Sequence, residues 1–273
     1  MSTGGQRPTR QPELAAPSIL VAGEIAGAVP GFLPSVHGLP FANAFSPGPT
    51  LRLGPLDPRV LGFGDASAGL CGGMALTARD LHEAGLSAPS GEASEGETTE
   101  GAGPPANGSH RFRALVRRQV QSLDWLRVPL RYLDLQALRP DPPYGLAAVL
   151  HREPPRVPAI LDEWPRIRAE IDGGHASVVG LIRTAGGSPW DLTRNHQVLA
   201  FAYVAGDRRI TLRIYDPNHP RRNDVELQAS ISADHGAPWR DRIRLTQSTG
   251  EPLLGFFRQP YPKPGSLRAW RPR

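Results

Sequence analysis

Apolar residues recur at helical spacing in three places along the first two thirds of the chain. The first begins at Cys71, where apolar residues follow at intervals of three or four positions, and this spacing predicts a helix. Gly85 is a suitable residue to close that helix, because glycine readily adopts the left-handed backbone found at helix ends. The same spacing predicts a second helix from near His110 and a third over 160–171, with Pro165 in its first turn or splitting it.

Beyond residue 173 the pattern changes to short, closely spaced apolar runs. Gly206 and Asp207 form a turn between two of these runs, which predicts a hairpin. Helices followed by strands, without alternation, predict an α+β fold with a helical first half and an antiparallel β-sheet in the second half. The predicted strands cover 175–182, 196–204, 210–215, 243–246 and 253–257.

Irregular segments are long, because proline and glycine number 30 each among the 273 residues. Residues 1–17 are polar and aperiodic, which predicts a disordered tail, and residues 87–109 lack large apolar side chains, which predicts a flexible insertion. We expect a single domain over 18–262, followed by a basic tail over 263–273. The many prolines between 30 and 58 predict an extended wrap over the surface, anchored by Phe32, Phe41 and Phe45.

The chain carries 31 basic and 26 acidic residues, a net charge of +5, and Lys263 is its only lysine. The arginines are dispersed and form no dense run with interleaved aromatic residues, so we expect no nucleic-acid partner. Because no apolar run is long enough to span a bilayer, we expect no membrane partner. No secretory signal is visible, which predicts a cytoplasmic protein or one exported without a cleaved signal peptide.

Cys71 is the only cysteine. It can form neither an intramolecular disulfide nor, alone, a thiolate metal site, which leaves an inert buried thiol or a nucleophile. Its place at the start of a predicted helix favours the thiolate, because the helix dipole and free N–H groups stabilise negative charge. Gly72 and Gly73 follow it. Since glycine weakens a helix, this pair predicts that another part of the chain approaches closely there.

A thiol nucleophile needs a base, and the base needs a group that fixes its orientation. His196 begins one predicted strand, and Asp216 lies at the end of the next strand. A hairpin that sets residue 204 opposite residue 208 also sets His196 opposite Asp216, so the two side chains become neighbours. The sequence therefore predicts a site formed by Cys71, His196 and Asp216.

Other residues are alternatives for these roles. His175 is the alternative base, since it also begins a predicted strand, and Asn218 is the alternative to Asp216, which also suits the first position of a turn. His219 is expected in that turn. A metal site through His196, Asp216 and His219 is the weaker alternative, because the sequence lacks a two-histidine helical motif. We predict no metal and no cofactor.

Two motifs resemble those of the papain-like cysteine peptidases: Gly-Leu-Cys-Gly-Gly-Met around Cys71, and the strand-initial His196 followed by Tyr-Asp-Pro-Asn from Tyr215. The second motif is particularly similar to the bacteriocin-processing peptidase domains of transporters. The resemblance covers residues 62–82 and 173–218. It implies a papain-like domain with the nucleophile at a helix N-terminus, and a cysteine peptidase that acts on a peptide or protein substrate.

One residue departs from the papain-like pattern. Those enzymes carry a glutamine shortly before the cysteine, which donates a hydrogen bond to the oxyanion, whereas Asp65 lies six positions before Cys71 here. An ionised aspartate cannot donate a hydrogen bond, so the Cys71 N–H with a second donor must stabilise the oxyanion instead. The side chains that could donate or support are Asn43, Asn195, Gln197 and Asn218.

The sequence thus predicts a thiol-dependent amide hydrolase or acyltransferase, with a cysteine peptidase as the leading function. One alternative is a catalytically degenerate papain-like binding or interaction protein. Another is a deamidase or protease effector with one protein target. The leading function and the effector both need a reactive Cys71, whereas the binding protein does not.

Overall fold

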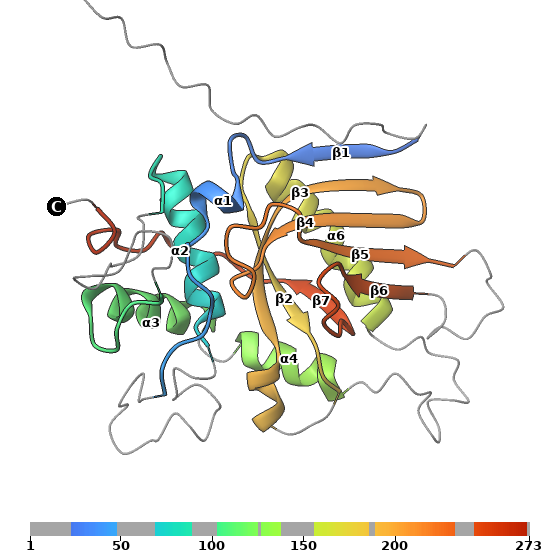
Figure 1. The fold of residues 1–273 in the computed structure, drawn as a ribbon. Coiled ribbons are helices and arrows are strands. Elements are labelled where there is room, and N and C mark those ends of the chain that lie inside the picture. Colours follow the sequence, from blue (N-terminus) through green and yellow to red (C-terminus); the bar gives the residue numbers. More distant parts are fainter. Residues whose placement is uncertain are drawn as a thin grey trace, which may run out of the picture.

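The computed structural model describes residues 23–47, 69–88, 103–124, 127–137, 156–185, 189–232 and 243–271. Helices lie mainly in the first half of these residues and an antiparallel sheet in the second half, so the predicted α+β class is confirmed (Figure 1). The predicted tail over 1–17 and most of the predicted insertion over 87–109 lie outside the described residues. None of the described helices is long and apolar enough to cross a membrane.

The helices are α1 (Pro34–His37), α2 (Cys71–Glu83), α3 (His110–Ser122), α4 (Arg127–Ala137), α6 (Arg156–Asp172) and the 3-10 helix η3 (Pro189–Arg194). α2 begins at Cys71 as predicted, and the chain leaves it where Gly85 has a left-handed backbone with φ of 68°. α3 also begins where predicted, because the Ser109 side chain accepts a hydrogen bond from the Phe112 N–H and caps the helix.

The third predicted helix, α6, differs in length and in the position of its proline. Pro165 lies inside α6, so the prediction that it sits in the first turn or splits the helix is wrong. The helix loses one backbone hydrogen bond there, but Ile167 and Ile171 remain buried against the core and hold the following turns in place. α4 is an additional helix that the sequence pattern did not predict.

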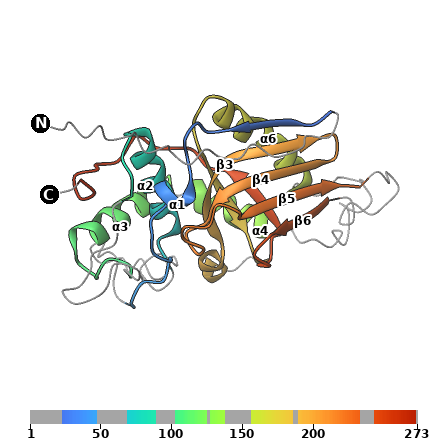
Figure 2. The ribbon, with the colours of Figure 1, turned by 45° about the horizontal axis from the view of Figure 1, so that its top comes forward.

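Seven strands form one antiparallel sheet: β1 (Ile25–Ala28), β2 (Ser177–Ile182), β3 (His196–Gly206), β4 (Arg209–Tyr215), β5 (Glu226–Ile231), β6 (Ile243–Gln247) and β7 (Gly255–Arg258). Their order is β6-β5-β4-β3-β2-β7, and β1 pairs with the second half of β3 (Figure 2). Five strands correspond to predicted ones. β1 and β5 do not, because their sequences, IAGA and ELQASI, are short and only weakly apolar.

The β3–β4 hairpin forms as predicted, but its register differs. Gly206 pairs with Arg209 across a two-residue turn, so the predicted pairing of 204 with 208 is wrong. A β-bulge at Phe201 then shifts the register by one residue, and Leu199 pairs with Tyr215. If this register is continued by one residue beyond Tyr215, Asp216 lies opposite Val198, which is two residues from His196. Side chains alternate between the two faces of a strand, so an error of two residues leaves both side chains on one face.

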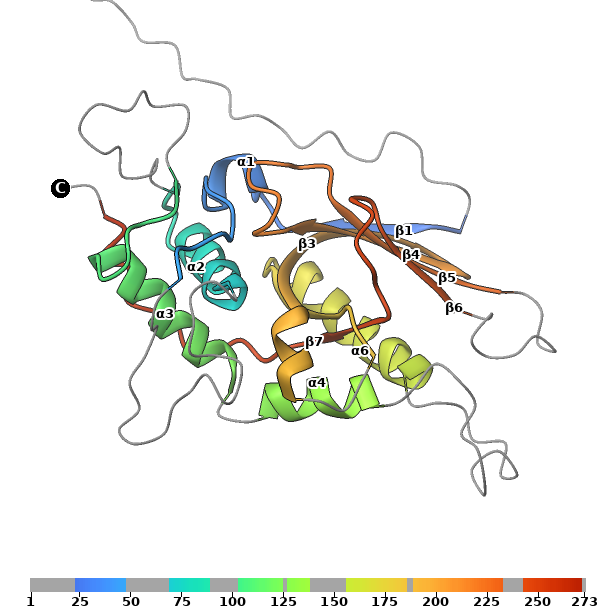
Figure 3. The same ribbon diagram turned by 60° about the horizontal axis from the view of Figure 1, so that its bottom comes forward.

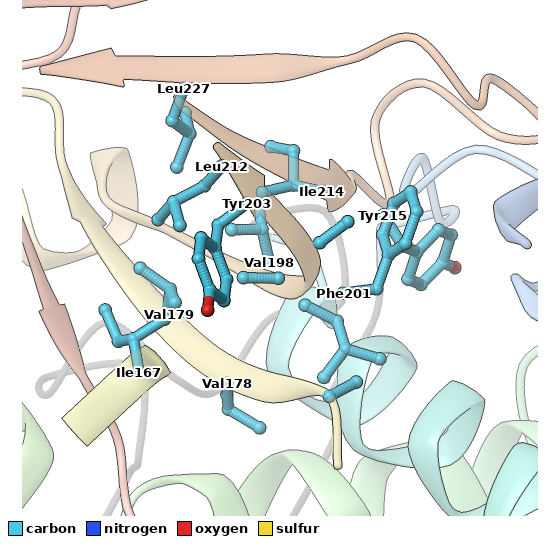
Figure 4. Packing of buried hydrophobic residues seen from close by; sticks show 14 of the residues in the cluster. Ile167, Val178, Val179, Val198, Phe201, Tyr203, Leu212, Ile214, Tyr215 and Leu227 are labelled. Carbon is cyan, nitrogen blue, oxygen red and sulfur yellow. The ribbon is translucent and has the colours of Figure 1, made fainter. Parts of the chain in front are cut away.

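The helices cover the sheet in two groups. α6 packs against β1, β3 and β7, while α2 packs against β3 and α3 and lies with α3 at one end of the strands (Figure 3). The main core lies between the sheet and these helices (Figure 4), and its side chains include Ile167, Val178, Val179, Phe201, Leu212 and Tyr215. The start of α2 therefore meets the sheet where β3 begins and β4 ends.

The N-terminal wrap is anchored as predicted within its described part, 30–47. Phe32 is buried in the main core, and Phe41 and Phe45 are buried in a second cluster between α2 and α3. Trp270, in the segment predicted as a basic tail, is buried in that same second cluster. Two segments from opposite ends of the sequence thus pack on the helical layer that carries Cys71.

Candidate active site

The loop before Cys71 is held by a side chain of the N-terminal wrap. The Leu70 N–H donates to Asn43 Oδ1 over 2.6 Å, and Gly69 has a left-handed backbone with φ of 88°. A Cβ at Gly69 would lie 2.4 Å from Asn43 Nδ2, so only glycine fits this turn. The turn places Cys71 at the first position of α2, where the free N–H groups of the helix lie.

Gly72 and Gly73 are required by close approach, as the sequence predicts. A Cβ at Gly72 would lie 1.9 Å from Gln197 Oε1, and a Cβ at Gly73 would lie 2.4 Å from the Leu115 carbonyl oxygen of α3. The Gly73 N–H donates to Gln119 Oε1 over 2.8 Å, so α3 also caps the first turn of α2. Small residues let both α3 and β3 reach the helix end that carries the thiol.

The three predicted site residues lie together in the structure. His196, the first residue of β3, has its Nε2 2.6 Å from Oδ1 of Asp216, which directly follows β4. The His196 and Asp216 side chains are only 4% and 0% exposed. Cys71 lies close enough to His196 for the histidine to lower the pKa of its thiol, through hydrogen bonding and charge. Because Asp216 occupies Nε2, the sulfur interacts with the other ring nitrogen, Nδ1.

The Asp216 carboxylate is surrounded by donors. Its Oδ1 also accepts the Asn218 N–H over 2.8 Å, and its Oδ2 accepts Gln247 Nε2 over 2.9 Å and lies 3.6 Å from Arg183 Nη2. Burial alone would raise the pKa of this carboxyl. The charge and hydrogen bond of His196, the Asn218 N–H and the Arg183 charge outweigh burial and hold the pKa well below its usual range.

Cys71 and His196 shift one another toward the charged forms. Burial alone would lower the pKa of His196, but the Asp216 carboxylate and the Cys71 thiol raise it to about 9. Burial alone would raise the pKa of the Cys71 thiol, but the hydrogen bond and charge of His196 lower it, together with the N–H groups of Gln197 and Gly72. Both shifts favour a thiolate beside an imidazolium.

The predicted oxyanion and support residues have different places in the structure. Asn43 holds the Leu70 N–H, and its Nδ2 donates to Asn218 Oδ1 over 3.3 Å. Asn195 is turned to other partners, because its Oδ1 accepts the Arg183 N–H and its Nδ2 donates to Gln136 Oε1. Asp65 lies outside the described residues.

Gln197 contributes to the site through its main chain, since its N–H helps to lower the pKa of the Cys71 thiol. Its side chain is buried against Gly72, and its Oε1 has no hydrogen-bond partner among the described residues. Asn218 also acts through its N–H, which donates to Asp216, so it does not replace Asp216 beside His196.

The alternative histidines are paired elsewhere. His175 Nδ1 lies 2.9 Å from Glu83 Oε1, at the last residue of α2, which is about 18 Å along the helix axis from Cys71. His219 lies in the turn after Asp216 as predicted, with its N–H bonded to the Asp216 carbonyl and its Nε2 2.5 Å from Glu251 Oε1. In the part of the chain that the structure describes, no group of three or more acidic, cysteine or histidine side chains could hold a metal ion.

Three residues that the sequence did not indicate support His196 and Asp216. The Tyr132 hydroxyl of α4 donates to the His196 carbonyl oxygen over 2.7 Å, while Gln247 and Arg183 contact Asp216. Gln247 ends β6 and Arg183 follows β2, so the ends of separate strands meet at Asp216. Arg183 and Gln247 directly follow predicted strands, which could have indicated them, whereas Tyr132 lies in the unpredicted helix α4.

Comparison with protein-family models, with curated proteins and with solved structures gives no match to this chain. The chemistry of the site therefore carries the functional inference.

Proposed function

We propose that this protein is a thiol-dependent amide hydrolase or acyltransferase of the papain-like type, and that it acts most directly as a cysteine peptidase. The observation that carries the proposal is the buried pair of His196 and Asp216 beside Cys71, with 2.6 Å between His196 Nε2 and Asp216 Oδ1. Cys71 is the nucleophile, His196 the acid and base, and Asp216 the group that orients the imidazole.

The chemistry follows from the charges of the pair. The Cys71 thiolate attacks the carbonyl carbon of an amide, and a carbon–sulfur bond forms while negative charge moves to the oxygen. The His196 imidazolium then gives its Nδ1 proton to the leaving nitrogen as the carbon–nitrogen bond breaks. The product is a thioester on Cys71. Water attacks the thioester carbonyl in hydrolysis, or another amine attacks it in transfer, and His196 accepts the proton of either nucleophile. The carbon–sulfur bond then breaks, which releases the acid or the new amide and restores the Cys71 thiolate beside the His196 imidazolium.

The start of α2 supports charge on the attacked oxygen. The Cys71 N–H has no acceptor among the described residues, and it belongs to the first turn of α2, where the helix dipole is positive. A backbone N–H in this position is a suitable oxyanion donor. The order of the motifs, with a helix-initial cysteine before a strand-initial histidine and a strand-final aspartate, supports the papain-like assignment.

Covalent labelling and turnover test the proposal together. A peptidyl acyloxymethyl ketone is expected to add once to the full chain, at Cys71, as seen in the intact mass. Cys71→Ala should abolish the label and His196→Ala should slow it by about two orders of magnitude or more. The matched control His175→Ala should react as wild type does, because His175 is paired with Glu83 instead.

A peptide library incubated with the wild-type chain then separates the reaction types. New peptide termini indicate a peptidase, joined peptides an acyltransferase, and a conversion of glutamine to glutamate a deamidase. Labelling that does not depend on His196, together with unaltered peptides, would leave only the degenerate binding protein.

A further inference from the structure

Asp216 is a buried carboxylate whose two oxygens have different partners. Oδ1 accepts the His196 Nε2–H and the Asn218 N–H, while Oδ2 is left to face the interior beside β6. A buried carboxylate oxygen without a donor costs free energy and allows the group to rotate or take up a proton. The orientation of Asp216 toward His196 therefore depends on what holds Oδ2.

Gln247 supplies that donor. Its Nε2 lies 2.9 Å from Asp216 Oδ2, and its side chain is 4% exposed, so water does not compete for the contact. Arg183 Nη2 lies farther away, at 3.6 Å from the same oxygen. Gln247 is thus the neutral hydrogen-bond donor in closest contact with the second oxygen.

Three partners fix the direction of the Gln247 amide. Its Oε1 accepts Arg183 Nη2 over 3.0 Å, and its Nε2 also donates to Thr249 Oγ1 over 2.8 Å. The Thr249 hydroxyl donates its own proton to Glu251, so its oxygen can only accept from Gln247. The oxygen of the Gln247 amide faces a donor and its nitrogen faces two acceptors. Rotation of the amide by 180° would therefore break all three hydrogen bonds.

We propose that Gln247, oriented by Arg183 and Thr249, is a positioning residue that locks the Asp216 carboxylate toward His196 and thereby maintains the reactive thiolate of Cys71. This inference rests on the proposed function. Gln247 touches neither the sulfur nor the imidazole, so it acts only through Asp216. Without its donor, Oδ2 turns toward Arg183, Oδ1 leaves His196, and the imidazolium that stabilises the thiolate loses its counter-charge.

Alkylation of the single cysteine measures this effect on the full chain. The rate with iodoacetamide is followed from acid to alkaline pH and scaled to its alkaline limit, so that the midpoint reports the thiol. In Gln247→Met, which keeps the length of the side chain but removes the donor, we expect the midpoint to rise by about one pH unit. The scaled rate at a pH well below the wild-type midpoint should then fall about tenfold.

Gln228→Met is the matched control, because Gln228 is an exposed glutamine on the neighbouring strand β5 whose side chain bonds to Glu226. It should leave the midpoint unchanged. A midpoint that depends on His196 but is the same in Gln247→Met as in wild type would overturn the positioning role alone. A midpoint that does not change in His196→Ala would overturn both the proposed function and this inference.

A measurement on the wild-type chain covers the case in which Gln247→Met does not fold. In the isotope-labelled protein, the Gln247 side-chain amide protons should exchange with solvent far more slowly than those of Gln228. Their resonances should also shift as His196 titrates. The inference would be refuted, without any variant, if the Gln247 amide protons exchanged as fast as those of Gln228. It would also be refuted if their resonances did not shift as His196 titrates.

Discussion

Replacing Asp216 with asparagine removes the negative charge beside His196 while keeping the size of the side chain. The pKa of His196 is about 9, compared with 6.5 for an ordinary histidine, so the folded state stabilises its imidazolium by about 3 kcal/mol. An asparagine also has only one oxygen. It therefore turns its NH2 group toward either His196 Nε2 or Gln247 Nε2, and one buried donor meets another.

The direction of both pKa shifts sets the pH window of this loss. Because folding raises the pKa of His196, its contribution is complete below about pH 6.5 and disappears as the pH rises through about 9. Because folding lowers the pKa of Asp216, its contribution is present above the ordinary carboxyl value of 3.8 and is lost in acid. We expect Asp216→Asn to lower the free energy of unfolding by about 3 kcal/mol near pH 5.5, and by less near pH 9.5, where the contribution of the His196 imidazolium is lost.

Urea unfolding followed by tryptophan fluorescence at about pH 5.5, 7.5 and 9.5 measures the difference. Asp224→Asn is the matched control, because Asp224 is exposed and pairs with Arg222 on the surface, where ion pairs contribute little. A loss of stability below about 1 kcal/mol near pH 5.5, or a loss that is the same near pH 9.5, would contradict the role of the His196–Asp216 pair.

Three further predictions concern the helix start, the support of His196 and the reaction. Gly73→Ala should destabilise the fold by about 1–3 kcal/mol, because the Cβ would lie 2.4 Å from the Leu115 carbonyl and better helix propensity returns only about 1 kcal/mol. Urea unfolding checks this against Gly103→Ala, where a Cβ meets nothing, and equal stability of the two variants would contradict it. Tyr132→Phe should lower stability by about 1–3 kcal/mol, because the His196 carbonyl loses its donor and the Gln259 amide its acceptor; an unchanged urea midpoint would argue against this. Amide hydrolysis should decline above about pH 9, where His196 loses the proton that the leaving nitrogen needs, and a rate that keeps rising there would count against His196 as the acid.

The sequence predicted the α+β class and the three residues of the candidate site, and the features behind these predictions are present in the structure. A lone cysteine before two glycines predicted a crowded helix start, and Gly72 and Gly73 indeed face β3 and α3. His196 and Asp216 were paired through a hairpin whose predicted register was wrong by two residues at the site. A register error of two residues leaves each side chain on the same face of the sheet, so His196 and Asp216 still meet.

The β-bulge at Phe201 explains why the register of the β3–β4 hairpin could not be predicted from the sequence. The turn register alone would direct Asp216 to the opposite face from His196, and the one extra residue at Phe201 restores the face. Nothing in the local pattern of β3 marks that residue, because all positions from 196 to 203 are buried. The bulge depends on how β3 packs on both sides, which no spacing of apolar residues encodes.

The supporting residues were missed for a different reason. Arg183, Gln247 and Tyr132 come from three separate elements and meet at the site only after the sheet has formed. None belongs to a short motif, and glutamine and tyrosine are common at strand ends and on helices. Their roles follow from distances and burial alone.

The ultraviolet absorbance of the thiolate, followed against pH, measures whether His196 keeps the Cys71 sulfur ionised, on which the proposed function depends. Since Cys71 is the only cysteine, the signal has a single source. We expect a midpoint below the ordinary thiol value in wild type, and a higher midpoint in His196→Ala, where burial raises the pKa of the thiol without the opposing effect of His196. The same midpoint in both proteins would contradict this role of His196.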